Sequence, residues 1–213
     1  MLPEYPHPII FAHRGAAAYA PENTLASFKT ALDQGADAIE LDAKLSADGY
    51  VVVCHDRTLN RTTNGTGELS RKTLAELREL DAGCHFSTKF AGEKIPLLEE
   101  VFETVGKKLL INVELTNYAT PYDQLVEKVC ALVIKHGLEG GVLFSSFFPL
   151  NLKKAFRLIP NVPQGLGIYF RNDSRIIFAS RENLPLGVCK RLSMRGIIPR
   201  NKDQRSRCQK AYF

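Results

Sequence analysis

Residues 38–45 read Ala-Ile-Glu-Leu-Asp-Ala-Lys-Leu. Apolar and polar residues alternate along this stretch, which predicts a strand whose side chains point to opposite faces in turn. Glu40 and Asp42 therefore share one face of that strand. The turn sequence at 46–49 (Ser-Ala-Asp-Gly) leads into a β-branched run at 50–54, so we expect the two strands to pair as a hairpin.

Strand and helix patterns alternate on both sides of this stretch. Short apolar runs predict further strands at 8–13, 109–115, 142–146 and 164–169, the last of the series. Apolar residues at helical spacing predict helices that begin after an Asn23 cap and from Pro96, with others at 72–79, 122–136 and 150–158. This alternation predicts an α/β fold with a parallel sheet and crossover helices. A Gly-x-Gly-x-x-Gly or Walker motif does not follow the first strand, which weighs against a nucleotide fold.

Polar residues cluster where the predicted strands end: His13, Arg14, Glu40, Asp42, His55, Glu114 and Ser146. Barrels and doubly wound α/β folds place their chemistry at that edge. Glu40 and Asp42 would repel each other there unless a cation lies between them, and Glu114 ends another strand in the same way. Three converging carboxylates would make a hard oxygen site suited to Mg²⁺ or Ca²⁺. The alternative is a structural ion network with Lys44 or Arg14.

Two histidines, His13 and His55, each end a predicted strand. Two imidazoles near one centre can act as acid and base in a single transfer at neutral pH. A lone histidine at a strand end is more commonly a structural residue, but two beside Arg14 and three carboxylates favour catalysis. Arg14 offers a planar fork that suits a phosphate, or alternatively a partner for the carboxylates.

Five motifs occur in order along the chain: His13-Arg14-Gly15, Pro21-Glu22-Asn23-Thr24, Glu40-Leu41-Asp42, His55-Asp56-x-x-Leu59-x-Arg61-Thr62-Thr63-x-Gly65-x-Gly67 and Asn112-Val113-Glu114-Leu115. Together they resemble the glycerophosphodiester phosphodiesterase family over roughly residues 8–170. A lone His-Arg-Gly is weakly specific, whereas five motifs in the family's order are strongly specific.

The resemblance implies a TIM (β/α)8-type barrel with a small insertion after the second βα region, at about 56–95. It also implies metal-dependent hydrolysis of a small glycerophosphodiester to sn-glycerol 3-phosphate and an alcohol. At the matching positions, the resemblance implies that Glu40, Asp42 and Glu114 bind a divalent cation, Mg²⁺ or Ca²⁺. It implies that His13 and His55 are the general acid and base and that Arg14 binds the substrate phosphate. Glu22 and Asn23 would lie near the site. Rival functions are lysophospholipase D activity and an inactive, truncated pseudoenzyme.

One position within the motifs departs from the family. Many members carry a lysine two residues after the third carboxylate, where this chain has Thr116. A cation that contacts phosphate is therefore either missing here or supplied by another residue.

A larger departure follows residue 170. Residues 1–170 hold 17 Lys and Arg against 20 Asp and Glu, whereas residues 171–213 hold 11 against 3. This segment lacks a strand–helix–strand pattern, and the chain has no Trp. We therefore expect a barrel domain at 1–170 that is incomplete at its C-terminus, and a basic, atypical tail at 171–213 from a truncated or frameshifted gene or a fragment. A solvated tail is favoured over one that binds a polyanion, so we expect no nucleic-acid partner.

Several classes of protein are excluded by composition. No apolar run reaches the roughly 18 residues of a membrane span, and the first residues lack the features of a secretory signal. Five cysteines without C-x-x-C spacing favour reduced thiols over a zinc site or disulfides. We therefore expect a cytoplasmic protein that acts on a small molecule. The sequence does not indicate an oligomeric state.

Overall fold

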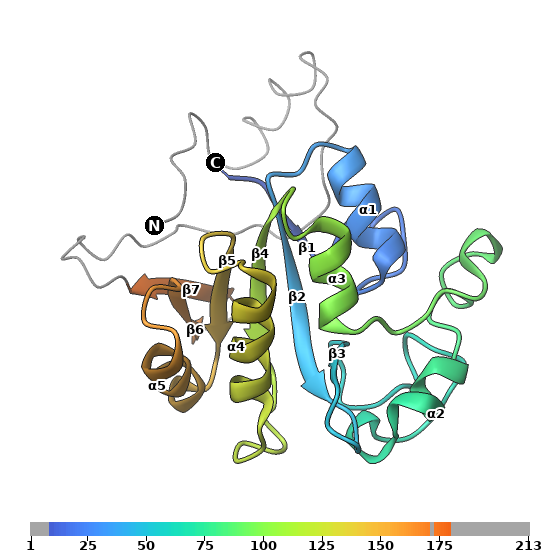
Figure 1. Ribbon diagram of the computed structural model, residues 1–213. Helices are drawn as coiled ribbons and strands as arrows, with labels where there is room; N and C mark the ends of the chain where they lie inside the picture. Colours follow the sequence, from blue (N-terminus) through green and yellow to red (C-terminus); the bar gives the residue numbers. More distant parts are fainter. Residues whose placement is uncertain (1–8, 171–172, 180–213) are drawn as a thin grey trace.

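A curved sheet organises the computed structural model, which describes residues 9–170 and 173–179, with the backbone alone at 168–170 and 173–179. Five strands run parallel in the order β1, β2, β4, β5 and β6. Their bounds are β1 Phe11–His13, β2 Ala38–Leu45, β4 Leu110–Leu115, β5 Val142–Ser146 and β6 Gln164–Phe170. Two strands are antiparallel: β3 (Val51–Val53) pairs with β2, and β7 (Asp173–Ala179) pairs with β6. The described strands form half of a barrel (Figure 1).

Helices cover one face of this sheet (Figure 1). They are α1 Leu25–Asp33, α3 Leu98–Val105, α4 Leu125–His136 and α5 Pro149–Leu158. Phe28 of α1, Phe102 of α3 and Val129 of α4 are buried in the same core as Leu41 and Phe144 of the sheet. Burial of this apolar face holds the helices against the sheet. Each Å² of apolar surface removed from water contributes about 25 cal/mol to the free energy of folding.

The alternation along β2 determines which face each side chain occupies. Ile39, Leu41 and Ala43 belong to the core under the helices, so Glu40 and Asp42 point to the opposite face, inside the barrel. A parallel sheet usually has two apolar faces. The inner face of this sheet carries carboxylates instead, which makes it the candidate functional site.

The segment 56–95 forms a small subdomain beside the carboxyl end of β2 (Figure 1). It contains α2 (Leu74–Glu79) and two short 3-10 turns, Leu69–Arg71 and Thr88–Phe90. Its own core includes the buried residues Val52, Cys54, Leu59, Leu69, Leu77, Ala82 and Ile95. The first residues after β3 are therefore held from both sides, by the barrel and by this insertion.

Two expectations about element ends were wrong. Thr24 caps α1 through its hydroxyl, which accepts from Ser27 N, because Asn23 has a left-handed φ of 56° and turns its amide toward the barrel. The strand at 164–169 is not the last, since β7 follows it and pairs along its length. The hairpin of β2 and β3 is confirmed.

Some expectations concern residues that the structure does not describe. Cys189, Cys208 and most of the tail lie outside the described ranges, and the proposed origin of residues 171–213 remains a prediction. Among the described residues, no helix is long and apolar enough to cross a membrane.

Candidate active site

Three carboxylates converge on the inner face of the barrel. Glu40 and Asp42 lie on β2, and Glu114 lies on β4 directly beside Asp42 in the parallel register. Ligand oxygens of the three side chains all lie within 4.8 Å of one another. Glu40 and Asp42 are each 1% exposed. Alternation on β2 and register between the strands therefore bring the predicted carboxylate group together.

A positive charge would stabilise this group of three carboxylates. Burial raises the pKa of Glu40 well above its usual value, and the nearby charges of Asp42 and Glu114 raise it further. Burial also raises the pKa of Glu114, with Asp42 as the next cause. Oε1 of Glu40 is buried without a hydrogen-bond partner. Clustered oxygen donors with an unpartnered buried oxygen fit a hard divalent cation.

The end of β1 and the turn after it place His13 and Arg14 beside these carboxylates. His13 Nε2 lies 3.6 Å from Glu40 Oε2, and the Arg14 backbone N–H donates to the same oxygen at 3.0 Å. Arg14 and Gly15 have left-handed φ angles of 57° and 79°, and a Cβ at Gly15 would lie 2.4 Å from Ser27 Oγ. Glycine is required there by both conformation and space. Burial, followed by the Arg14 charge, lowers the pKa of His13 to about 4, so its ring is neutral at pH 7.

Arg14, Glu22 and Asn23 connect the loop before α1 to the carboxylates. Arg14 Nη1 donates to Glu22 Oε1 at 2.9 Å, and Arg14 Nε lies 3.6 Å from Asp42 Oδ2. Asn23 Nδ2 donates to the same Asp42 oxygen at 2.9 Å. The alternative interpretation of Arg14 as a partner for carboxylates is thus partly realised. Asn23 orients Asp42, which accounts for its own left-handed backbone.

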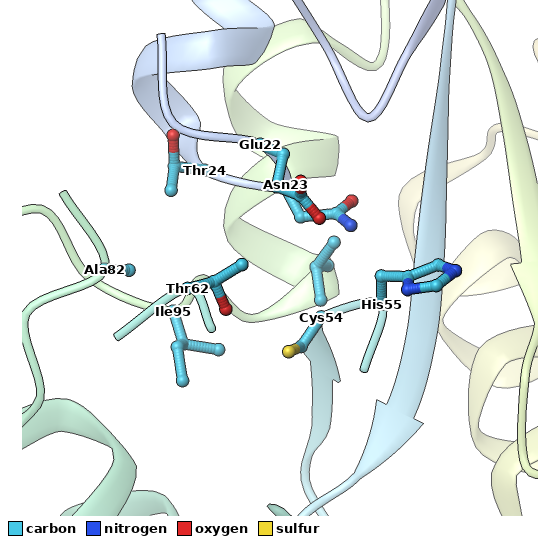
Figure 2. A pocket seen from close by; sticks show the side chains of 9 residues that line it. Glu22, Asn23, Thr24, Cys54, His55, Thr62, Ala82 and Ile95 are labelled. Atoms are coloured by element: carbon cyan, nitrogen blue, oxygen red, sulfur yellow. The ribbon is translucent and has the colours of Figure 1, made fainter. Parts of the chain in front are cut away.

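His55 follows β3 at the other side of the group. Figure 2 shows Glu22 and Asn23 above the end of β3, where the His55 ring and the Cys54 thiol point in different directions. His55 Nδ1 lies 2.6 Å from Asp56 Oδ1, and 42% of its side chain is exposed. A carboxylate on Nδ1 favours the tautomer that leaves Nε2 free to accept a proton.

Arg61 belongs to the motif that begins at His55, but the sequence did not indicate a role for it. Its guanidinium donates to both oxygens of Glu22 at 2.7 and 2.8 Å and to both oxygens of Asp56 at 2.7 and 2.9 Å. Burial alone would raise the pKa of Glu22, but Arg61 and Arg14 hold it below its usual value. Arg61 also holds the pKa of Asp56 far below its usual value. One side chain of the insertion therefore connects the neighbours of Arg14 and of His55.

Lys44 does not form the ion network expected as an alternative for Glu40 and Asp42. Its ammonium donates to Thr116 Oγ1 at 2.7 Å and to the Thr116 carbonyl oxygen at 3.3 Å. Burial lowers the pKa of Lys44. In the turn that follows β4, Tyr118 donates its hydroxyl to Glu114 Oε1 at 2.7 Å. Both residues lie at the edge of the carboxylate group. The sequence pointed to Lys44 only as an ion partner of Glu40 and Asp42, and it gave no signal for Tyr118.

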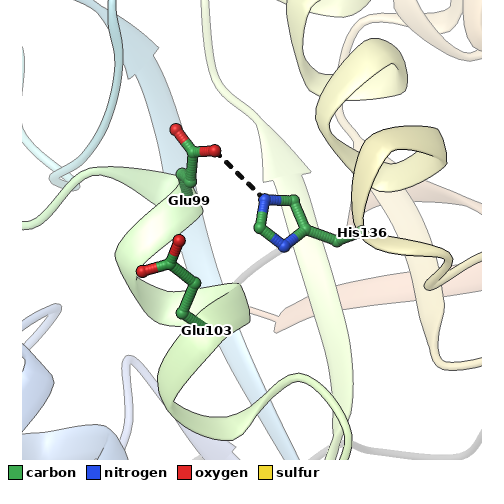
Figure 3. A group of neighbouring side chains, drawn as sticks. All are labelled: Glu99, Glu103 and His136. Carbon is green, nitrogen blue, oxygen red and sulfur yellow. Dashed lines mark hydrogen bonds and ion pairs between the residues drawn. The ribbon is translucent and has the colours of Figure 1, made fainter.

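A second group with metal-ligating side chains lies on the outer helices. Glu99 and Glu103 of α3 face His136 of α4 (Figure 3), with His136 Nε2 3.2 Å from Glu99 Oε1. Lys135 also donates to that Glu99 oxygen, and Glu103 is exposed. A lysine and a histidine already neutralise this group, so it is a surface ion network.

Comparison with known proteins supports the resemblance. Residues 13–170 match the model of the glycerophosphoryl diester phosphodiesterase family. A glycerophosphodiester phosphodiesterase of Caldanaerobacter subterraneus is 44% identical over 74% of this chain and 65% of its own length. A putative glycerophosphodiester phosphodiesterase of Bacillus subtilis is 36% identical over 90% of this chain and 82% of its own length.

Solved structures show the same fold. A phosphodiesterase of Oleispira antarctica, solved in complex with the product sn-glycerol-3-phosphate, is 37% identical with a TM-score of 0.70. The match covers 74% of this chain and 64% of that one. This chain thus spans less than two thirds of the length of that structure and of the Caldanaerobacter relative. The described half-barrel corresponds to part of a (β/α)8-type barrel, and the chain belongs to the glycerophosphoryl diester phosphodiesterase family.

Proposed function

We propose that this chain hydrolyses a glycerophosphodiester to sn-glycerol 3-phosphate and an alcohol, and that the reaction requires a divalent cation. The observation that carries this proposal is the carboxylate group of Glu40, Asp42 and Glu114 with His13 and Arg14 against it. The names of the family and of its relatives support the same reaction. We also propose that the protein works in the cytoplasm, where its three described cysteines would stay free thiols.

A phosphodiester resists attack because it is an anion, and this site would counter that charge. Arg14 presents a guanidinium beside the carboxylates, and its Nε is buried without a hydrogen-bond partner. That donor suits a phosphoryl oxygen. A Mg²⁺ or Ca²⁺ ion held by Glu40, Asp42 and Glu114 would supply further positive charge for the transition state. Asn23 keeps Asp42 in position for this role.

Proton transfer falls to the two histidines in this proposal. His55 has its Nδ1 on Asp56, so its Nε2 can take a proton from the attacking oxygen. His13 is neutral at pH 7 and lies against Glu40, so it can also accept that proton. The histidine that has taken the proton then gives it to the leaving oxygen. The attacking group is either water or the substrate's own glycerol hydroxyl, and both need the same proton acceptor.

The test is release of glycerol 3-phosphate from glycerophosphocholine by the purified chain. The assay is run with Mg²⁺, with Ca²⁺ and with EDTA, and lysophosphatidylcholine serves as a second substrate. We expect release that EDTA abolishes and that either or both ions restore. Release that persists in EDTA contradicts the cation requirement. Turnover of the lysophospholipid alone replaces the proposal with lysophospholipase D activity, and no release from a cooperatively melting sample favours an inactive chain.

Replacing Arg61 with Gln should lower kcat/KM for glycerophosphocholine by roughly 10- to 100-fold. The reason is that Arg61 holds Glu22 and Asp56, which in turn contact Arg14 and His55. Tm should change little, because Arg61 is 47% exposed and exposed ion pairs stabilise weakly. Arg78→Gln is the matched control, since Arg78 pairs with Glu100 away from the site. Equal kinetics for both variants would remove Arg61 from the site.

A further inference from the structure

Lys44 is a half-buried cation whose hydrogen-bond partners are neutral. It lies on the same face of β2 as Glu40 and Asp42, because positions 40, 42 and 44 alternate in phase. The register pairs Ala43 with Leu115, so Lys44 and Thr116 are neighbours across the two strands. Both contacts of its ammonium are to Thr116 oxygens. Among the described residues Lys44 forms no ion pair with a carboxylate.

A cavity of about 200 Å³ lies beside this ammonium. His55 and Lys44 line it together with Thr116, Tyr118 and Arg57. Tyr118 also donates to Glu114 Oε1, so the cavity adjoins the carboxylate group. Asp and Glu are missing from its lining among the described residues, and its charged members are Lys44 and Arg57. The two charged side chains in the lining are therefore both cations.

The bonding of this lysine leaves room for one more acceptor. An ammonium has three hydrogens, and the two contacts to Thr116 use two of them. Removing part of a charge from water is costly unless the charge is paired, and a neutral threonine does not pair it. An oxyanion in the cavity would accept the third hydrogen and neutralise the charge.

We propose that Lys44 binds the substrate phosphate in this chain, and so supplies from β2 the cation that the family resemblance led us to expect at position 116. This inference rests on the proposed function for the identity of the substrate. The ligand class is a phosphate monoester or diester with one oxygen toward Lys44 and the reacting centre near His55. Thr116 acts as a positioning residue, because its two oxygens hold the ammonium at the cavity wall.

The test measures binding of sn-glycerol 3-phosphate by calorimetry in Mg²⁺, alongside KM and kcat for glycerophosphocholine. Lys44→Gln should weaken binding of glycerol 3-phosphate by about 10- to 100-fold, the effect of losing a charged hydrogen bond. KM should rise by a similar factor. The double variant Lys44→Thr/Thr116→Lys moves the ammonium to the residue that follows β4 and should recover most of the affinity. Lys153→Gln, an exposed lysine on α5, is the control.

Each outcome separates this inference from the proposed function. The inference is supported if Lys44→Gln binds glycerol 3-phosphate weakly with an unchanged Tm and the double variant recovers the affinity. Lys44→Gln that binds like the unsubstituted chain overturns it, as does an unsubstituted chain that does not bind glycerol 3-phosphate. If the chain binds this ligand through Lys44 but releases none from glycerophosphocholine, the proposed reaction fails and the phosphate site stands. Lys44→Gln decides the case even if the double variant does not fold.

Discussion

Alanine in place of His13 should lower kcat for glycerophosphocholine by about 10²- to 10⁴-fold, the usual contribution of a positioned acid or base. His13 lies 3.6 Å from Glu40 at the carboxylate group, and His55 faces the same region from β3. His55→Ala should therefore cost a similar factor. The double variant should be little slower than either single variant, because residues that act as a unit are not additive. Steady-state kinetics at saturating substrate give all three values.

The matched control for this experiment is His136→Ala. His136 also contacts a carboxylate, Glu99, but on the outer helices away from the barrel mouth (Figure 3). Its replacement should leave kcat unchanged and lower Tm slightly, because His136 also packs against Phe102. A full rate for His13→Ala, with Tm unchanged, would refute the acid–base assignment.

Mg²⁺ or Ca²⁺ should stabilise the chain through Glu40, Asp42 and Glu114. A cation at 100 times its Kd adds about 2.7 kcal/mol to the free energy of unfolding. That corresponds to a rise in Tm of roughly 5–10 °C for a chain of this size. Glu40→Gln should abolish the rise, whereas Glu103→Gln, an exposed glutamate on α3, should keep it. Differential scanning calorimetry with EDTA and with added cation measures both.

The pH dependence in EDTA checks the same carboxylate by a different route. The pKa of Glu40 is raised above its ordinary value of 4.5 in the folded chain. The folded state therefore holds a proton that the unfolded state releases, and the stability from Glu40 is lost as pH rises from 4.5 through the folded pKa. Unfolding free energy should fall with pH more steeply in the unsubstituted chain than in Glu40→Gln. Parallel curves for the two would contradict the raised pKa.

Local patterns in the sequence predicted the inner face of the barrel well. The period of two along 38–45 is a property of the strand backbone, so it placed Glu40 and Asp42 on one face without knowledge of any partner. Parallel strands end at one edge, which explains why Glu114 joins them. The sequence gave the wrong cap for α1 because both Asn23 and Thr24 are good capping residues. In the structure the Asn23 side chain donates to Asp42, so Thr24 is the residue that caps the helix.

Tertiary structure alone decided which side chains serve the site from a distance. Arg61 meets Glu22 across 39 positions in the chain, and Lys44 meets Thr116 across 72. Both contacts depend on how the insertion packs on the loop before α1 and on the register between β2 and β4. The sequence predicted β1 to β6 and the face that carries Glu40 and Asp42, because strand alternation is a property of the backbone within a few residues, but it missed β7. The partners of Arg61 and Lys44 depend on packing between segments that are far apart in the sequence. A local sequence pattern does not encode such packing.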